Sequence, residues 1–388
     1  MPSSEIRVPE RPADLTVEFL QGVLASDAAT ASSRVVSFSW RPMEVGVISE
    51  VVAIDLVLQD SQHQPQTQEK ALIAKFLRPE FPFERMFVVE SNFYQQLADT
   101  TKVKTKVTPQ PFGVPHALFL SKVLIILERV SPVETYSCVA GCPKDRIEQV
   151  VERLAQFHGL HWTTDTSQLA SPAGIGSELS GGAKRDQFPG AWRSFLDDVA
   201  LPDDVVDTIA SICERLSSQP QQLEWIHNAV VNGPSTLIHG DFHTANLLFP
   251  PTTTEGLTDQ PLWLVDWATC GKGNPMRDLA FFFIVGVRSE DREDLEQASL
   301  ETYAAMIDKA GVTELTLSDW QRHYRLCVLN QFLILVVYDN LSKHLASNAK
   351  SEKLRQELHA HFREVNLRAC LAVLEHFREE DLARIAAL

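Results

Sequence analysis

One stretch of the sequence decides the fold. It reads Leu237-Ile-His-Gly-Asp-Phe-His-Thr-Ala-Asn-Leu-Leu-Phe249 and is followed by Trp263-Leu-Val-Asp-Trp267. Short apolar runs flank polar residues in both pieces, so the pattern predicts a strand, a loop, a short strand, a turn and a third strand. The loop carries Asp241 and Asn246, and the third strand delivers Asp266. We therefore expect two carboxylates and an amide to lie close together.

Such a group of side chains suits phosphoryl transfer from Mg·ATP to a hydroxyl, which needs an acceptor-orienting base and oxygen ligands for magnesium. Asp241 is the candidate catalytic base, and Asn246 and Asp266 are the candidate Mg²⁺ ligands. The alternative for a single Asp or Asn in a loop is an Asx turn. Three such residues at the ends of successive apolar strands make that alternative a poor explanation.

Length and composition define the class of protein. A chain of 388 residues is too long for one ordinary core and predicts two or three lobes. An apolar content of 44% with 22% charged residues is typical of a soluble globular protein. The net charge of −16 argues against nucleic acid as a partner and would favour a cationic small substrate.

The sequence also predicts a cytoplasmic location. The first residues contain no apolar core, so no secretory signal is visible. The longest apolar runs are too short to span a bilayer, so we expect no membrane association. Six scattered cysteines without metal-type spacing predict reduced thiols, and Cys138 and Cys142 are interpreted as ordinary thiols.

Periodicity predicts a two-lobed α+β fold. Residues 35–77 are rich in strand patterns, a helix follows at about 84–97, and a strand follows at 122–128. From Arg146 onward the pattern is mainly helical, and residues 163–190 are predicted to be an exposed loop because they are rich in Ser, Gly and Thr.

We expect a small β-rich N-terminal lobe over residues 1–131 that binds ATP. A large, mainly helical C-terminal lobe over residues 132–388 would carry catalysis and substrate binding.

Lys75 and Glu90 form a second candidate group. Strand alternation places Lys75 in an apolar row, and helical spacing places Glu90 on a core-facing stripe. Taken alone, Lys75 is best interpreted as an edge-strand lysine whose side chain reaches solvent. A buried carboxylate needs a partner, however, and a lysine on the preceding strand can provide it. The pair is therefore predicted to form, with Lys75 contacting ATP phosphates as in kinase-like enzymes.

A phosphate-covering loop is expected in the turn between the first two strands, at residues 43–51. This turn contains one glycine, so Gly46 and Ser49 are its candidate phosphate contacts. A plain hairpin turn is the alternative.

Histidines near the decisive stretch suggest another chemistry. His239 and His243, with His158 and His161, could be offered as ligands of a metallohydrolase. Their spacing lacks the pair of histidines four residues apart that hydrolytic zinc sites show on a helix. His239 is more simply predicted to brace the loop by hydrogen bonds. Asp278 is predicted to be the N-cap of an apolar helix starting at Leu279, and it could also brace the loop by accepting backbone hydrogen bonds.

The sequence resembles the aminoglycoside phosphotransferase and choline kinase superfamily, including its ecdysteroid-kinase-like branch. The resemblance lies in His239-Gly-Asp-Phe-His-Thr-Ala-Asn246, Val265-Asp-Trp267 and Gly273-Asn-Pro-Met-Arg-Asp-Leu-Ala280. Glu90-Ser-Asn-Phe-Tyr and Leu154-Ala-Gln-Phe-His158 are similar to further patterns of that family. The similarity covers roughly residues 35 to 345.

The resemblance implies roles for the candidate residues. Asp241 would be the base, Asn246 and Asp266 the magnesium ligands, and Lys75 the phosphate contact. Glu128 to Val130 would be a connector whose backbone meets adenine, with Glu128 and Val130 as nucleotide contacts. Helices of the second lobe would form the acceptor pocket, with candidate residues Trp162, Tyr303, Tyr324, Gln331 and Asp339.

The spacing of the motifs separates this chain from protein kinases. Only 11 residues lie between Asp266 and Asp278, which leaves no room for a long segment that docks a peptide. The expected reaction is therefore ATP- and Mg²⁺-dependent phosphorylation of a small-molecule hydroxyl. The alternatives are a catalytically inactive kinase-like nucleotide-binding module and a metallohydrolase.

Overall fold

A computed structural model describes residues 7–43, 49–60, 67–79, 83–98, 111–169, 181–199, 201–251, 261–349 and 351–378. The chain divides into two compact units. The N-terminal unit consists of Met1–Asp99 and Val114–Val133, and the C-terminal unit consists of Thr100–Gly113 and Glu134–Leu388. The predicted assignment of residues 1–131 to ATP and 132–388 to catalysis stays a prediction, because a division by packing does not test function.

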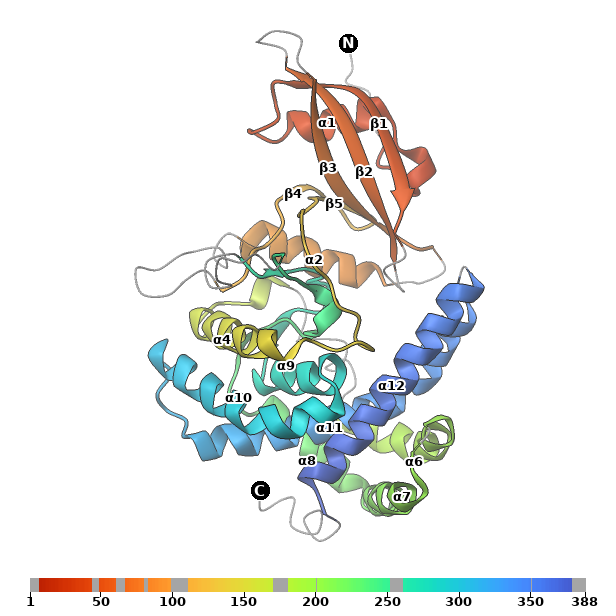
Figure 1. The fold of residues 1–388 in the computed structure, drawn as a ribbon, viewed down its shortest axis with the longest axis vertical. Coiled ribbons are helices and arrows are strands. Elements are labelled where there is room, and N and C mark those ends of the chain that lie inside the picture. The colour runs from red at the N-terminus through yellow and green to blue at the C-terminus, as the bar shows by residue number, and fades with distance from the viewer. Residues whose placement is uncertain are drawn as a thin grey trace. The chain divides into compact units, whose positions relative to one another are not determined.

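The N-terminal unit is built on one antiparallel sheet of five strands in the order β1-β2-β3-β5-β4 (Figure 1). The strands are β1 (Ser33–Pro42), β2 (Ser49–Asp60), β3 (Thr67–Leu77), β4 (Ala117–Leu120) and β5 (Leu124–Glu128). Register is set along β3, where Lys75 pairs with Val51 of β2 and with Ile125 of β5.

Alternation along β3 separates two environments. Leu72, Ala74 and Phe76 are buried in a core shared with α1 (Val17–Ala25), whose first turn is capped by Thr16. Lys75 points to the other face of the sheet, where it meets α2 (Glu84–Gln96). One face of the sheet therefore provides the core, and the other face presents the lysine.

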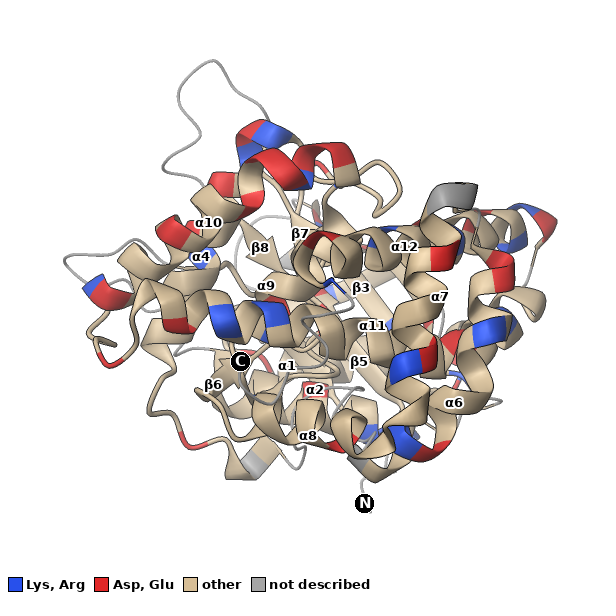
Figure 2. Cartoon of the chain, turned by 90° about the horizontal axis from the view of Figure 1, so that it is seen from below, with Lys and Arg blue, Asp and Glu red and all other residues tan. Residues whose placement is uncertain are grey.

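The C-terminal unit is mainly helical, which confirms the predicted α+β class. Its longer helices are α4 (Lys144–Leu160), α6 (Gly181–Asp198), α7 (Asp203–Ser218), α8 (Pro220–Val231), α10 (Ser289–Lys309), α11 (Leu317–Ser347) and α12 (Glu352–His376). Helix α11 is central, because it contacts α6, α8, α9 (Met276–Phe281), α10 and α12. Figure 2 shows acidic and basic residues distributed over these helices. No described helix is long and apolar enough to cross a membrane.

The predicted loop over residues 163–190 is wrong in its last part, because α6 begins at Gly181 and contains Pro189. Glycine and proline favoured a loop. Tertiary packing overrides this preference: Phe188 and Phe195 are fully buried and lie edge-on to Phe332 of α11, at ring distances of 6.3 and 5.8 Å. The short helical turn Ser167–Leu169 (η2) lies earlier in the same stretch, and residues 170–180 lie outside the described part.

A buried lysine joins three of these helices. Lys184 of α6 is fully buried and donates from Nζ to Asn330 Oδ1 of α11 at 2.7 Å and to His227 Nδ1 of α8 at 3.1 Å. Burial, and then the charge of Arg277, lower the pKa of Lys184 to about 7. The amine is therefore close to half-protonated in the folded protein at neutral pH, whereas it is fully protonated in the unfolded chain.

This difference predicts a pH-dependent stability. Between pH 7 and 10 the unfolded chain holds a proton on Lys184 that the folded chain lacks, so this residue makes the free energy of unfolding rise with pH by about 1.4 kcal/mol per unit. Lys184→Met should remove that contribution from urea-unfolding curves measured across this range. Lys309→Met on the exposed end of α10 is the control and should keep the wild-type slope. Equal slopes in wild type and Lys184→Met would contradict a depressed pKa.

Candidate active site

Two small antiparallel ladders hold the loop that carries Asp241. In the C-terminal unit, β6 (Thr236–Ile238) pairs with β9 (Gly271–Gly273), and β7 (Leu247–Leu248) pairs with β8 (Trp263–Leu264). The loop runs between β6 and β7 and ends in the helical turn Thr244–Asn246 (η3). We call residues 239–246 the catalytic loop, after the role that the sequence predicts for Asp241. Both of its ends are thus fixed in neighbouring ladders.

Asp278 binds the start of the catalytic loop. Its carboxylate accepts the backbone N–H of His239 at 2.7 Å and that of Gly240 at 2.8 Å. His158 Nε2 lies 3.3 Å from the same carboxylate, and Tyr303 donates its hydroxyl to His158 Nδ1 at 2.9 Å. Burial opposes ionisation, but these hydrogen bonds keep the pKa of Asp278 below its usual value.

Asp278 is not the N-cap of a helix starting at Leu279, so that prediction is wrong. Helix α9 begins at Met276 after Pro275, and Asp278 lies in its first turn. The fixed φ of proline suits a helix start, and Asn274 Oδ1 accepts the N–H of Met276 at 3.0 Å. The Asp278 carboxylate is therefore used by the catalytic loop and not by its own helix.

Gly240 is required by its backbone and by its neighbour. Its φ is +84°, a conformation that glycine adopts without steric strain. A Cβ atom at this position would lie 2.4 Å from the carbonyl oxygen of Thr269. Thr269 also donates its hydroxyl to the carbonyl oxygen of His239 at 3.1 Å, so the turn is packed from both sides.

His239 links the catalytic loop to the strand of Asp266. Its Nε2 donates to the carbonyl oxygen of Val265 at 3.0 Å, and its Nδ1 accepts the N–H of Asp241 at 3.3 Å. Burial lowers the pKa of His239, so the ring is neutral. The ring also lies edge-on to Trp267 at a ring distance of 4.8 Å. Both nitrogens are engaged by the backbone, which leaves neither one for a metal ion.

Asp241, Asn246 and His243 form the polar group of the loop. Asn246 Nδ2 donates to the Asp241 carbonyl oxygen at 2.9 Å and to Asp241 Oδ2 at 3.3 Å. His243 Nε2 lies 3.4 Å from the same carboxylate oxygen. Burial would raise the pKa of Asp241, but the charge of His243 and its hydrogen bonds lower it to about 2. Asp241 is therefore ionised at neutral pH, and its side chain stays 34% exposed.

Asp266 follows β8 with an unusual backbone. Its φ of +63° lies in the left-handed region, which few residues other than glycine adopt, although Asp tolerates it better than most. The preceding residue, Val265, donates its N–H to the carbonyl oxygen of Asn246 at 3.1 Å. Strained backbone of this kind gathers at functional sites. The turn therefore brings Asp266 next to the end of the catalytic loop.

The donor set suits a hard cation. Asn246 uses its Nδ2 inside the loop, so the atom it can offer is the oxygen Oδ1. Together with the Asp266 carboxylate this gives the oxygen chemistry that Mg²⁺ prefers. No cluster of three or more His, Cys, Asp or Glu side chains in the described residues is arranged to hold a metal ion.

The N-terminal unit has the predicted lysine–glutamate contact. Lys75 Nζ lies 2.7 Å from Glu90 Oε2, and the Glu90 side chain is 2% exposed. The ammonium also lies 5.8 Å from the ring centre of Phe87, within the range of a cation–π contact. The contact fixes the lysine on the sheet face turned toward α2, and its role toward phosphates stays a prediction.

The other predicted nucleotide contacts are placed in part. Gly46 lies outside the described residues, and Ser49 is the buried first residue of β2. Glu128 uses its backbone N–H for the carbonyl oxygen of His116 at 2.8 Å, and its side chain binds Lys70 at 3.0 Å. In the described part of the chain the backbone N–H of Val130 has no partner. Of these groups, Val130 has the backbone donor that a nucleotide base could use.

A family model of the ecdysteroid kinase-like family matches residues 46–311. The chain belongs to this family. A comparison with curated protein sequences gives no significant match. The family assignment confirms the resemblance predicted from the sequence motifs.

Three solved structures are similar to this ecdysteroid kinase-like protein over most of its length. A mutant of aminoglycoside 2′-phosphotransferase-IIIa in complex with GDP has 12% identity and a TM-score of 0.50, with 90% of this chain and 97% of that chain covered. A microcompartment-associated aminopropanol kinase has 15% identity and a TM-score of 0.49, covering 90% and 95%. Choline kinase from Cryptosporidium parvum has 10% identity and a TM-score of 0.49, also covering 90% and 95%. At 12% identity, the phosphotransferase match shows a shared fold and not a shared substrate.

The predicted acceptor-pocket residues of this kinase-like chain are largely packed inside the C-terminal unit. Tyr303 and Tyr324 are fully buried, and their hydroxyls contact His158 and Glu296. Trp162 lies edge-on to Trp320 at 6.2 Å. These tyrosines therefore serve packing and hydrogen bonding, and the first of them supports Asp278 through His158.

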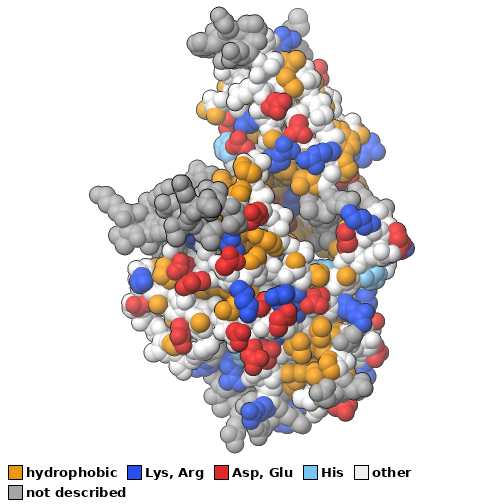
Figure 3. Space-filling view, in the orientation of Figure 1, with side chains coloured by type: hydrophobic (Ala, Val, Ile, Leu, Met, Phe, Trp, Pro, Cys, Tyr) orange, Lys and Arg blue, Asp and Glu red, His pale blue; other side chains and the backbone are white. Residues whose placement is uncertain are grey.

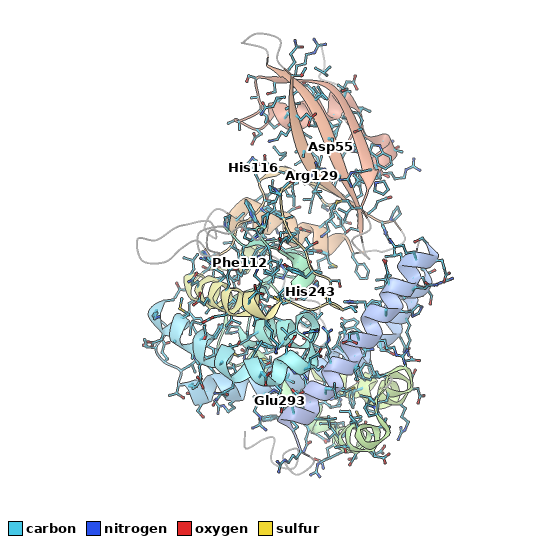
Figure 4. All side chains as sticks on the ribbon, viewed as in Figure 1. Asp55, Phe112, His116, Arg129, His243 and Glu293 are labelled. Carbon is cyan, nitrogen blue, oxygen red and sulfur yellow. The ribbon has the colours of Figure 1, made fainter. Side chains whose placement is uncertain are left out.

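A chain of contacts behind Asp241 was not predicted. Figure 4 labels His243 on the catalytic loop. Its Nδ1 lies 3.4 Å from Cys138 Sγ, and the carbonyl oxygens of Cys138 and Val139 accept from Arg368 of α12 at 2.7 and 2.9 Å. Arg368 is buried and also reaches the carbonyl oxygen of Val285 at 3.2 Å. Cys138 was interpreted as an ordinary thiol, and nothing in the sequence places it or Arg368 near the loop.

Phe112 is a further supporting residue that sequence reasoning missed. Its ring lies 6.0 Å from Phe157 and 5.8 Å from Phe242 of the catalytic loop (Figure 4). The fully buried Phe242 in turn lies 5.8 Å from Phe282. An aromatic cluster thus packs against the loop and anchors it to the buried core through Phe242.

The geometry of Gly240 predicts the effect of a single methyl group. Gly240→Ala should lower the free energy of unfolding by about 2 kcal/mol or more and displace Asp241. The new Cβ would clash with the Thr269 carbonyl oxygen, and alanine is strained at the positive φ of this residue. Gly190→Ala in α6 is the matched control. No atom lies within 4 Å of its Cβ position, so alanine there should stabilise the helix by about 0.5–1 kcal/mol. Calorimetric melting of both variants tests this, and an unchanged melting temperature for Gly240→Ala would contradict it.

Proposed function

We propose that this protein transfers the γ-phosphoryl group of Mg·ATP to a hydroxyl of a small molecule. The observation that carries the proposal is the catalytic loop. It presents an ionised, partly exposed Asp241 beside Asn246, and it is fixed by the buried Asp278. Family membership and the fold of aminoglycoside phosphotransferases support the same reaction class.

Asp241 would accept or orient the proton of the attacking hydroxyl. A base must be deprotonated and within reach of solvent or substrate, and Asp241 meets both conditions. His243 and Asn246 hold its Oδ2. The hydroxyl would therefore approach the other carboxylate oxygen, Oδ1.

Asn246 Oδ1 and the Asp266 carboxylate would hold magnesium. The ion supplies neutralisation of the charge that develops on the phosphate oxygens during transfer. In the N-terminal unit, Lys75 would contact the phosphates while Glu90 fixes its position, and the backbone of Glu128 and Val130 would meet the base. Gly46 and Ser49 remain proposed contacts of the phosphate-covering turn.

A small molecule is the acceptor that the chain can accommodate. The interval between Asp266 and Asp278 is filled by β9 and by the start of α9, so no peptide-docking segment fits there. The net charge of −16 disfavours polyanions, and acidic and basic side chains are interspersed among the described residues on the face in Figure 3.

The first test is ADP release from Mg·ATP against a panel of alcohols. The panel should include an amino alcohol, a quaternary ammonium alcohol, an aminoglycoside, a sugar and a polycyclic alcohol. Stimulation by one class in the wild type, and not in Asp241→Ala, is the expected result and identifies the substrate class. Bound ATP without any turnover, either to these alcohols or to water, would instead favour an inactive nucleotide-binding module.

Replacement of Asp241 should lower turnover without weakening ATP binding. Asp241→Asn keeps the shape of the side chain and removes its charge, so turnover should fall by about 10²- to 10⁴-fold while ATP affinity stays within a factor of about two. Asp308→Asn at the exposed end of α10 is the control and should retain full turnover. Unchanged turnover in Asp241→Asn would overturn its assignment as the base.

The magnesium assignment predicts a shift in metal dependence. Asp266→Asn preserves tolerance of the left-handed backbone but removes a charged ligand, so half-maximal turnover should need at least about tenfold more Mg²⁺. Asn246→Ala should also raise the Mg²⁺ concentration that half-maximal turnover needs. Nucleotide affinity measured in excess EDTA should match the wild type in both variants. An unchanged Mg²⁺ dependence would remove these residues from the metal site.

A further inference from the structure

Helix α12 reaches the catalytic loop through its inner face. Arg368 connects α12 to the backbone of Cys138 and Val139, and Cys138 contacts His243 on the loop. These contacts place one face of α12 beside the group that contains Asp241. Residues seven positions apart lie on the same face of a helix, about two turns from each other.

His361 occupies that face, seven residues before Arg368. Because Arg368 on the same face contacts the segment of Cys138, which in turn contacts His243, His361 lies on the side of α12 that is turned toward the catalytic loop. The charges of His243, Asp241 and Arg368 act on its imidazole. The ring is half-buried and makes no hydrogen bond within the described residues. Burial lowers the pKa of His361 to about 4, and the ring is therefore neutral at physiological pH.

The neighbours of His361 on its face of α12 are either apolar or already paired with another side chain. Glu364 is paired with Arg368 at 2.8 Å, and Glu357 lies 3.8 Å from Lys353. Leu358 and Val365, one turn before and one turn after His361, are buried and apolar. Within the described part of this stripe, the imidazole is the hydrogen-bonding group that still lacks a partner.

We propose that His361 belongs to the acceptor site and orients the acceptor hydroxyl above Asp241 by a hydrogen bond from its neutral imidazole. The inference rests on the proposed phosphotransferase function. It assigns one wall of the acceptor site to the face of α12 that carries His361 and Arg368, and not to the exposed face of the helix. His361 acts as a donor or acceptor to an uncharged oxygen, and Asp241 takes the proton.

Site-directed labelling tests this position without knowledge of the acceptor. All six native cysteines are buried, so a cysteine introduced at a position that solvent reaches, such as the half-buried 361 or the exposed 359, reacts selectively with a maleimide. The test compares His361→Cys with His359→Cys, which lies two residues away on the exposed side of the same helix. Each variant is measured before and after reaction with N-phenylmaleimide, with water as the acceptor of the phosphoryl group.

After labelling, the rate of Mg·ATP hydrolysis by His361→Cys should fall by at least about tenfold, because the adduct occupies the space above Asp241 from which the acceptor attacks. Its affinity for a fluorescent ATP analogue and its melting temperature should stay unchanged. Labelled His359→Cys should hydrolyse Mg·ATP like the unlabelled protein. With an alcohol from the panel as acceptor, His361→Ala should raise KM for that alcohol more than it lowers kcat, and His361→Gln should restore part of the loss.

The other outcomes are equally decisive. Unchanged hydrolysis after labelling at position 361 would overturn the assignment, as would an equal loss after labelling at position 359. If the wild type neither hydrolyses Mg·ATP nor transfers its phosphoryl group to any alcohol, the proposed function fails first and the assignment of His361 fails with it. Comparison with Asp241→Asn separates these cases, because this variant tests the reaction independently of α12.

Discussion

The carboxylate of Asp278 is the constraint on which the site depends. It accepts two backbone N–H groups at the start of the catalytic loop and is itself held by His158, which Tyr303 orients. A buried carboxylate is costly unless hydrogen bonds satisfy it. The need for those bonds fixes the loop, and through Gly240 and His239 it also fixes the turn that follows β8.

Two carboxylates of the same unit thus serve different purposes because their surroundings differ. Asp278 is enclosed and uses its oxygens for backbone amides, whereas Asp241 is partly exposed and shares one oxygen with His243 and Asn246. Both have a lowered pKa, so both are ionised at neutral pH. Exposure therefore decides which of them can meet a substrate. The left-handed backbone of Asp266 adds a third carboxylate to the end of the loop.

Much of this arrangement could be predicted from the sequence, because it is encoded locally. The motifs around Asp241, Asn246 and Asp266 lie within about thirty residues of one another, and strand periodicity predicted the sheet that carries Lys75. The helix start at Met276 was missed because Asp278 has two possible uses, and only its partners distinguish them. Helix α6 was missed because burial of Phe188 and Phe195 outweighs the local preference of Gly181 and Pro189.

The sequence by itself determined the family, the α+β class and the residue types of the candidate site, since each depends on short motifs or on periodicity. Only the tertiary structure decided which distant residues complete the site. Cys138 and Arg368 are 230 positions apart, and His361 lies 120 positions after Asp241, so no local pattern relates them. They meet because α12 packs against the segment that carries Val285, and that packing depends on long-range burial and not on the spacing of residues along the chain.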